Sequence, residues 1–357
     1  MGICRRVVGV AALALTVAAI APAWGRHGFP RAGRLGIVAA IERAACTGPA
    51  APRAGRAAVF KVEVLLDRLA ISPGIIDGKS GGNLSKAVAA FQRSRGLKPS
   101  ARLDRETLEK LCASTSGPVL ISYTVTGEDV RGPFTAEIPA SLEGMARLDR
   151  LGYRNAVELL AEKFHTSEET IRLLNPGKAV DRAGTVLTVP NVADERPAGQ
   201  AVRIEADKSV GAVRALGRHD ELLAFYPASI GSAEKPAPSG TWRVLRVARD
   251  PTYRYDPKFR FKGVRTDKPL VIAPGPNNPV GSVWIGISKE TYGLHGTSHP
   301  ETVGETGSHG CVRMTNWDAL DLARRVRTGT PVAFLDRVET VLSTDTRAAR
   351  RDDGLAR

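Results

Sequence analysis

The sequence predicts a multidomain α+β protein, with helical units in the first half of the chain and a β-rich domain towards its end. Apolar residues recur at helical spacing between residues 59 and 111. Short alternating segments separated by Gly and Pro turns fill residues 200–336 instead, which is typical of a β-rich domain. A chain of 357 residues also exceeds one typical domain, so two or three are expected.

Composition indicates a globular, loop-rich protein with a strongly basic balance. Hydrophobic residues make up 43% of the chain, which also contains 36 Gly and 23 Pro. The formal charge of +14 favours an anionic partner such as nucleic acid, a membrane surface or an acidic polymer, although solubility alone would also explain it. The sequence lacks zinc-finger spacing and blocks of basic residues interleaved with aromatics, so we expect no nucleic-acid partner.

The N-terminus has the pattern of a secretory signal peptide. Arg5 and Arg6 precede an apolar run over residues 7–21, and small-residue patterns over 19–23 supply a cleavage site. A membrane anchor is the alternative, but the run is shorter than the about 20 residues that span a bilayer. We therefore predict a signal peptide over 1–23, export to the periplasm or cell wall, and no stable membrane span after cleavage.

Three cysteines remain after such a cleavage: Cys46, Cys112 and Cys311. In an oxidising compartment an odd number leaves one thiol over. Cys46 and Cys112 bracket a compact helical segment, so we predict that they form a disulfide and that Cys311 stays free.

Residues 24–45 are rich in Ala, Gly and Arg and are predicted to be a linker. A helical domain over 46–113 follows. Its first helix stops at Pro73-Gly74, its second ends before Gly96, and Asp104 caps its third. This segment resembles the three-helix peptidoglycan-binding domain, and the matching residues are Ile76-Asp77-Gly78, Ala87-Val88-Ala89-Ala90-Phe91-Gln92, Gly96-Leu97 and Asp104-Arg105-Glu106-Thr107-Leu108. A plain helical bundle is the alternative.

A module over 118–195 is predicted to have strand–helix–helix–strand order. Its strands are 119–125 and 184–190, its first helix is 155–164, and a capping box of Thr166 and Glu169 starts the second helix. Residues 126–150 have no regular pattern. His165, between the helices, is interpreted as a surface or packing residue.

This order is similar to a LysM glycan-binding module, through Leu174-Asn175-Pro176 and Gly184-Thr185-Val186-Leu187-Thr188-Val189-Pro190. The insertion at 126–150 departs from the compact family pattern. Glycan binding is what the resemblance implies.

The β-rich domain over 200–337 includes strands such as 202–205 and 242–247 and one helix over 317–328, and a flexible tail over 338–357 follows it. Within this domain, Cys311 follows His295 by 16 positions. A thiol attacks as the thiolate, and a neighbouring histidine can remove its proton and later return it to the leaving group. We therefore assign Cys311 as nucleophile and His295 as general base and acid, oriented by a backbone carbonyl near Gly296.

Other residues of the same stretch have candidate roles. Gly310 permits a tight turn beside the thiol, and the amides of Gly310 and Cys311 are candidate oxyanion donors. Arg313 is a candidate for holding a substrate carboxylate. Two alternatives stay open from the residues alone: a buried cysteine with scattered histidines, and a zinc site made from His295, His299, His309 and Cys311, although no Cys-x-x-Cys pair accompanies them.

The full motif resembles that of the L,D-transpeptidase (YkuD-type) family, through His295-Gly296-Thr297 and Ser308-His309-Gly310-Cys311-Val312-Arg313-Met314. Three flanking segments, 225–231, 238–241 and 279–281, are also similar. Some family members have Asn two positions after the cysteine, so the role of Arg313 is left open.

The resemblance implies a β-rich catalytic domain that acts on peptidoglycan stem tetrapeptides through a thioester, releases D-Ala and forms 3–3 cross-links without a metal or organic cofactor. It places Ser308 and His309 at the cysteine turn and Tyr292, Gly296 and Arg313 at the substrate, and it implies acylation by carbapenems. Two alternatives remain. The same fold could act as an L,D-carboxypeptidase or as an enzyme that anchors or releases a protein, or the chain could be a non-catalytic wall-binding protein.

Overall fold

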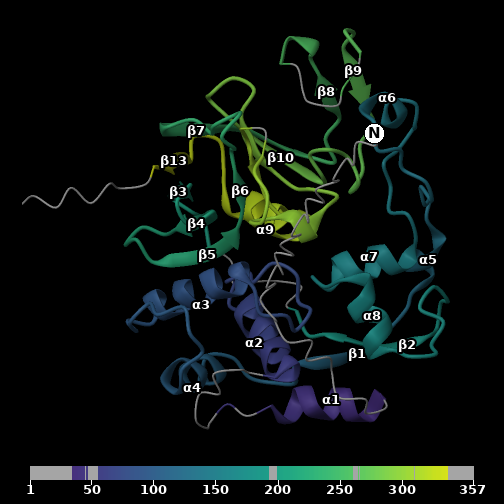
Figure 1. Ribbon diagram of the computed structural model, residues 1–357, viewed down its shortest axis with the longest axis vertical. Coiled ribbons are helices and arrows are strands. Elements are labelled where there is room, and N and C mark those ends of the chain that lie inside the picture. The colour runs from purple at the N-terminus through teal and green to yellow at the C-terminus, as the bar shows by residue number, and fades with distance from the viewer. Residues whose placement is uncertain are drawn as a thin grey trace, which may run out of the picture.

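The structure is a computed structural model that describes residues 34–44, 46, 55–192, 199–259, 264, 266–308 and 310–336. The predicted signal peptide, the predicted tail and His309 lie outside the described residues. Figure 1 shows a large sheet with α9 against it, α2, α3 and α4 below it on one side, α7, α8 and the two-stranded sheet β1–β2 on the other, and α1 at the bottom beneath β1.

The helices are α1 Arg34–Arg43, α2 Arg56–Arg68, α3 Gly82–Ser94, α4 Arg105–Ala113, α5 Gly127–Arg131, α6 Leu142–Met145, α7 Ala156–Lys163, α8 Glu168–Leu174 and α9 Asn316–Arg325. The strands are β1 Leu120–Thr124, β2 Val186–Pro190, β3 Arg203–Asp207, β4 Ala212–Leu216, β5 Leu222–Pro227, β6 Ser229–Ile230, β7 Gly240–Arg249, β8 Tyr253–Tyr255, β9 Leu270–Ile272, β10 Val283–Ile287, β11 Gly293–His295, β12 Val312–Arg313 and β13 Pro331–Leu335. Two 3₁₀ turns, η1 Pro257–Phe259 and η2 Pro300–Thr302, complete the elements.

The predicted three-helix unit is formed by α2, α3 and α4. The side chain of Asp104 accepts a hydrogen bond from the Thr107 amide and so caps α4, because the first amides of a helix have no partner within it. Gly96 adopts φ +68° just after α3, which is the left-handed conformation that ends many helices. The structure contains the predicted Cys46–Cys112 disulfide, at a sequence separation of 66.

Part of the segment that we predicted to be a linker is a helix. Within residues 24–45, α1 covers Arg34–Arg43, and its Ile37 and Ile41 are buried against α2 and the β1–β2 module. The Ala, Gly and Arg content suggested a flexible segment, but two isoleucines four positions apart supply an apolar stripe. The linker prediction is therefore wrong over this helix.

The module after α4 has the predicted strand–helix–helix–strand order. β1 pairs antiparallel with β2, with Leu120 opposite Pro190. The helices α7 and α8 lie between these two strands in the sequence. Two details differ from the prediction. Ser167, not Thr166, caps α8, because the Thr166 hydroxyl donates to the carbonyl of Ile76 instead. Two short helices, α5 and α6, occupy the stretch that we expected to be irregular.

The β-rich domain is a nine-stranded sheet in the order β5-β4-β3-β13-β7-β10-β11-β12-β6. Its two ends, β5 and β6, are separated in the chain only by Ala228. The sheet must therefore curl until its first and last strands meet, and α9 packs against β10 and β11 (Figure 1). This curl carries β6 to the edge of β12, which begins immediately after Cys311.

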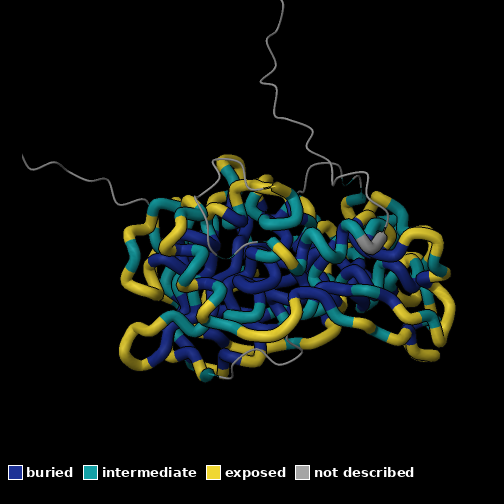
Figure 2. The backbone as a smooth tube through the Cα atoms, turned by 90° about the horizontal axis from the view of Figure 1, so that it is seen from below, coloured by how far each residue is buried: buried dark blue, intermediate teal, exposed yellow. Residues whose placement is uncertain are grey.

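The modules share their hydrophobic cores. One core joins Ile41 of α1 and Phe60 of α2 to Leu160 and Ile171 of the β1–β2 module. Another joins the three-helix unit to Ala212 and Phe225 of the large sheet, where Ile71 also forms a β-bridge with Phe225. The buried segments accordingly run through the middle of the molecule in Figure 2, with the exposed segments at its rim. Within the described residues, none of the helices is long and apolar enough to cross a bilayer.

The disulfide yields a stability prediction. Replacing both partners (Cys46→Ser with Cys112→Ser) should lower the free energy of unfolding by about 2–4 kcal/mol, because the cross-link restricts the unfolded chain. Urea denaturation followed by tryptophan fluorescence measures this change. Cys311→Ser, which leaves the disulfide intact, is the matched control, and equal midpoints for the double variant and this control would contradict the prediction.

Candidate active site

Two adjacent strands bring the predicted base and nucleophile together. β11 and β12 pair in parallel, with Leu294 opposite Val312 and His295 opposite Arg313. Paired residues project from the same face of a sheet, as do residues two apart on one strand. Cys311, two positions before Arg313, is therefore on the face that carries His295. Residues 16 positions apart in the sequence become neighbours through this pairing.

His295 is held by its own backbone and by a tryptophan. Its Nδ1 lies 2.7 Å from the carbonyl oxygen of Gly296 and must donate to it, because a carbonyl only accepts. Its ring stacks on Trp284, the residue opposite it on β10, with 5.7 Å between the ring centroids. The side chain keeps 7% of its exposure, and this burial lowers the pKa of His295 to about 4, with Arg313 acting in the same direction. At neutral pH the imidazole is neutral, with a proton on Nδ1 and a lone pair on Nε2.

Cys311 is a free thiol, and it lies immediately before the first residue of β12. Its Sγ is 3.8 Å from the carbonyl oxygen of Thr291, to which the thiol donates. Burial raises the pKa of Cys311 to about 11, and the hydrogen bond from the Gly293 amide only partly offsets this effect. A neutral thiol beside a neutral imidazole fits general-base catalysis, in which the proton leaves as the sulfur attacks. It does not fit a preformed thiolate–imidazolium pair.

The turn before Cys311 is held by Ser308 and Gly231. The Gly231 amide donates to Ser308 Oγ at 2.7 Å, the Ser308 amide donates to the Gly231 carbonyl at 2.9 Å, and the Ser308 hydroxyl donates to the carbonyl of Cys311. Gly310 adopts φ +98°, where a side chain would be strained, and a Cβ there would lie 3.1 Å from Tyr292 Cε1. Ser308, Gly310 and Tyr292 thus shape the turn as contacts, whereas the oxyanion and substrate roles stay predictions.

Arg313 lies opposite His295 on the neighbouring strand, near the His295–Cys311 pair (the dyad). Its side chain hydrogen-bonds to other residues of the same domain. Its Nη2 donates to Thr306 Oγ1 at 2.5 Å and approaches Ser229 Oγ at 3.3 Å, with the carbonyls of Thr306 and Gly307 further away. It therefore ties the loop before Cys311 to β6. Binding of a substrate carboxylate by Arg313 remains a prediction.

The structure does not assemble the alternative zinc site within its described part. Residues 34–336, apart from the gaps given above, contain no group of three or more His, Cys, Asp or Glu side chains placed to hold a metal ion. His299 pairs with Glu301 at 3.1 Å on the surface instead. His165, interpreted as a packing residue, stacks on Trp317 at 5.4 Å, and its Nδ1 lies 3.0 Å from Asp67 Oδ2.

Three residues near the dyad were not identified from the sequence. Trp284 stacks on His295, and Tyr253 of β8 lies close enough to Cys311 for the thiol's charge to contribute to raising the tyrosine pKa to about 12. Burial is the larger cause of that shift. Asn316 is fully buried behind Gly296, where a Cβ on the glycine would lie 2.1 Å from Asn316 Oδ1. Asn316 lies two positions after Met314, the last residue of the motif, and this position was the one available signal.

Comparison with known families agrees with this geometry. Residues 201–333 match the YkuD family model, described as "L,D-transpeptidase catalytic domain", and this range holds the curled sheet, His295 and Cys311. Residues 55–111 match a second family model, described as "Putative peptidoglycan binding domain", which corresponds to α2–α4.

Relatives of known name are similar over about half of the chain. The protein named "Putative L,D-transpeptidase YkuD" from Bacillus licheniformis is 26% identical over 180 residues, which are 50% of this chain and 92% of that protein. "Probable L,D-transpeptidase ErfK/SrfK" from Escherichia coli is 32% identical over 189 residues, 51% of this chain and 59% of that protein. The structure of L,D-transpeptidase 3 from Mycobacterium tuberculosis with a faropenem-derived adduct is 20% identical, covers 43% of this chain and 75% of that chain, and has a TM-score of 0.30.

The neutral state of the Cys311 thiol yields a prediction about alkylation. The rate at which iodoacetamide modifies Cys311 should rise with pH without reaching a plateau below about pH 10, because the thiol pKa is raised to about 11. Mass spectrometry of the Cys311 peptide measures the rate. The same peptide in guanidinium-unfolded protein is the control, with a midpoint near an ordinary thiol pKa of about 8.5. A plateau by pH 7 in the folded protein would indicate a preformed thiolate instead.

Proposed function

We propose that this protein is an L,D-transpeptidase that acts on peptidoglycan stem tetrapeptides and forms 3–3 cross-links. The observation that carries the proposal is the pairing of β11 with β12, which sets a neutral His295 and a free Cys311 on one face of a YkuD-type sheet. The catalytic-domain match and the peptidoglycan-binding match in one chain support the substrate class.

The acylation step follows from the protonation states of the dyad. Cys311 Sγ attacks the carbonyl that joins the third residue of the stem to the terminal D-Ala, while its proton passes to Nε2 of His295. The amides of Gly310 and Cys311 stabilise the oxyanion, a contribution of about 3 kcal/mol per donor in comparable sites. His295 then protonates the leaving amine, D-Ala departs and a thioester to Cys311 remains.

The second step regenerates the thiol. An amine on a neighbouring stem attacks the thioester carbonyl and gives a proton to His295, which returns it to the sulfur as the C–S bond breaks. One amide bond is broken and one is formed overall, so the cycle needs no metal, oxidant or organic cofactor. Resolution by water gives a carboxypeptidase instead, and resolution by a protein amine gives an anchoring enzyme.

The accessory modules supply the proposed site of action. The three-helix unit over 46–113 binds peptidoglycan, the β1–β2 module over 118–195 binds glycan, and both keep the domain over 200–337 at the cell wall after export. The matched binding domain and the basic charge of +14 support an acidic wall polymer as partner. A non-catalytic wall-binding protein would not need the ordered Cys311 turn.

The test uses purified stem tetrapeptides and mass spectrometry of the products. We expect release of D-Ala with formation of cross-linked dimers, a complete loss of both with Cys311→Ala, and a rate about 10²–10⁴-fold lower with His295→Ala. Tripeptide without dimer would identify the hydrolytic alternative. Dimer formation by Cys311→Ala would refute the thiol mechanism.

A further inference from the structure

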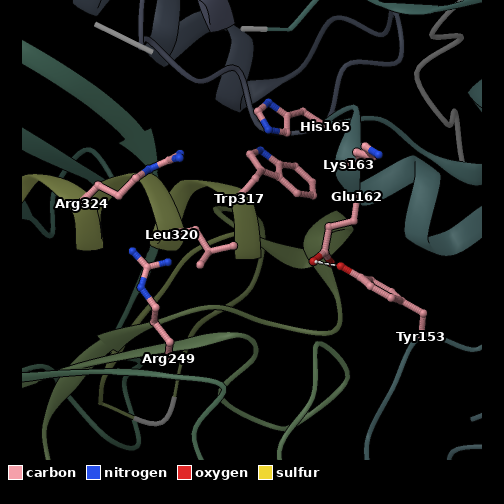
Figure 3. A pocket seen from close by; sticks show the side chains of 8 residues that line it. All are labelled: Tyr153, Glu162, Lys163, His165, Arg249, Trp317, Leu320 and Arg324. Atoms are coloured by element: carbon pink, nitrogen blue, oxygen red, sulfur yellow. Dashed lines mark hydrogen bonds between the residues drawn. The ribbon is translucent and has the colours of Figure 1, made fainter. Parts of the chain in front are cut away.

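The helix α7 of the β1–β2 module contacts the β-rich domain through the half-buried carboxylate of Glu162. Glu162 Oε2 accepts a hydrogen bond from Asn316 Nδ2 at 2.9 Å, and Glu162 Oε1 accepts one from the Tyr153 hydroxyl at 2.9 Å. Figure 3 shows Glu162 reaching towards Tyr153 at the edge of a cavity of about 270 Å³, with Trp317 of α9 beside it. Glu162 thus joins two modules that the sequence places in separate domains.

Asn316 transmits this contact to the backbone beside His295. Its Nδ2 also donates to the Pro276 carbonyl at 3.1 Å, and its Oδ1 accepts from the Ser282 amide at 3.0 Å, so the orientation of the amide is fixed. The same Oδ1 lies against Gly296, where no side chain fits. Gly296 in turn supplies the carbonyl that holds His295 Nδ1.

We propose that Glu162 is a positioning residue for the catalytic base: through Asn316 and Gly296, its ionised carboxylate keeps the His295 ring and tautomer in place. The inference deepens the proposed function and rests on it. Glu162 is not in hydrogen-bond contact with Cys311 or His295, so it acts on them through Asn316 and Gly296.

The charge of Glu162 changes within the range in which the protein can be assayed. Burial raises the pKa of Glu162 to about 7, Glu158 acts in the same direction, and the bonds from Asn316 and Tyr153 oppose the shift. The other titratable groups around it are Lys163 on its own helix and, across the cavity, His165, Arg249 and Arg324. The loop 274–278, which packs on the other side, carries no charged residue.

Protonation of Glu162 therefore weakens its contact with Asn316. A carboxylate accepts both hydrogen bonds as charge-assisted bonds, whereas the oxygens of a carboxylic acid are weaker acceptors, so the bond from Asn316 Nδ2 weakens even if the Tyr153 hydroxyl turns to accept the acid proton. Below about pH 7 Asn316 loses part of its restraint. The His295 and Cys311 groups titrate near 4 and 11, so an inflection between them belongs to neither.

The experiment measures how fast a carbapenem acylates Cys311 between pH 5.5 and 8.5, by mass spectrometry of the whole protein. We expect the wild-type rate to fall about fivefold from pH 8 to pH 6, the effect of one hydrogen bond. Glu162→Gln should give a flat profile near the wild-type rate at pH 6, since its amide resembles the protonated acid, with one acceptor oxygen, and does not titrate. Glu162→Ala should lower the rate at every pH.

The matched control is Glu169→Gln, which removes an exposed carboxylate from the same module and should leave the wild-type inflection unchanged. A flat wild-type profile, or an inflection that survives in Glu162→Gln, would overturn the inference. Thermal unfolding of each variant separates misfolding from a change in the rate. A wild-type protein that is not acylated at any pH would count against the proposed function itself, whereas acylation without a Glu162 effect would count against the positioning role of Glu162 alone.

Discussion

The parallel pairing of β11 with β12 is the interaction on which the candidate site depends. β12 has two residues, too few to hold a position by itself. It is fixed on its other edge by β6, at its start by the Ser308–Gly231 bonds, and beyond its end by the Met314 amide, which donates to the His295 carbonyl at 2.9 Å. The curl of the sheet is what makes β6 available, so the cysteine turn is a consequence of the whole domain.

The two accessory modules brace different parts of this arrangement. Asn83 of α3 donates to the carbonyl of Val303 at 2.7 Å, and the next amide along, that of Gly304, donates to Ser229 Oγ at 3.1 Å. The three-helix unit thereby contacts the loop that leads to Cys311. Glu162 of α7 reaches the residue behind His295 from the other side. Because the modules also share hydrophobic cores, their docking is part of the fold.

Most elements were predictable from the sequence because their signals are local. The cap at Asp104, the glycine after α3, the strand run that became β2 and the Cys46–Cys112 pair all follow from residues near one another or from counting. Within the candidate site, the expected backbone carbonyl partner of His295 is present, because Nδ1 lies 2.7 Å from the carbonyl oxygen of Gly296, while the catalytic roles stay predictions.

The errors arose where distant contacts decide the structure. Thr166 is a good capping residue by type, but the Ile76 carbonyl of another module takes its hydroxyl. The apolar residues of α1 are buried only because α2 and the β1–β2 module pack against them. Likewise Glu162 is an ordinary helix residue in the sequence, and its role appears only once α9 brings Asn316 against it. Contacts between modules leave no local pattern, so sequence reasoning cannot find them.

The electrostatics of the dyad explain why such contacts matter for reactivity. Taking a thiolate and an imidazolium out of water costs free energy, and burial here keeps both groups neutral. In the proposed mechanism the sulfur has no permanent charge and becomes nucleophilic only while its proton moves to His295 Nε2. Such a transfer requires hydrogen-bond reach and the correct tautomer. With a neutral dyad, the rate of this proton transfer depends on how well Cys311 Sγ and His295 Nε2 are aligned. Ser308, Gly296 and Asn316, from three different segments of the chain, hold the backbone around these two residues.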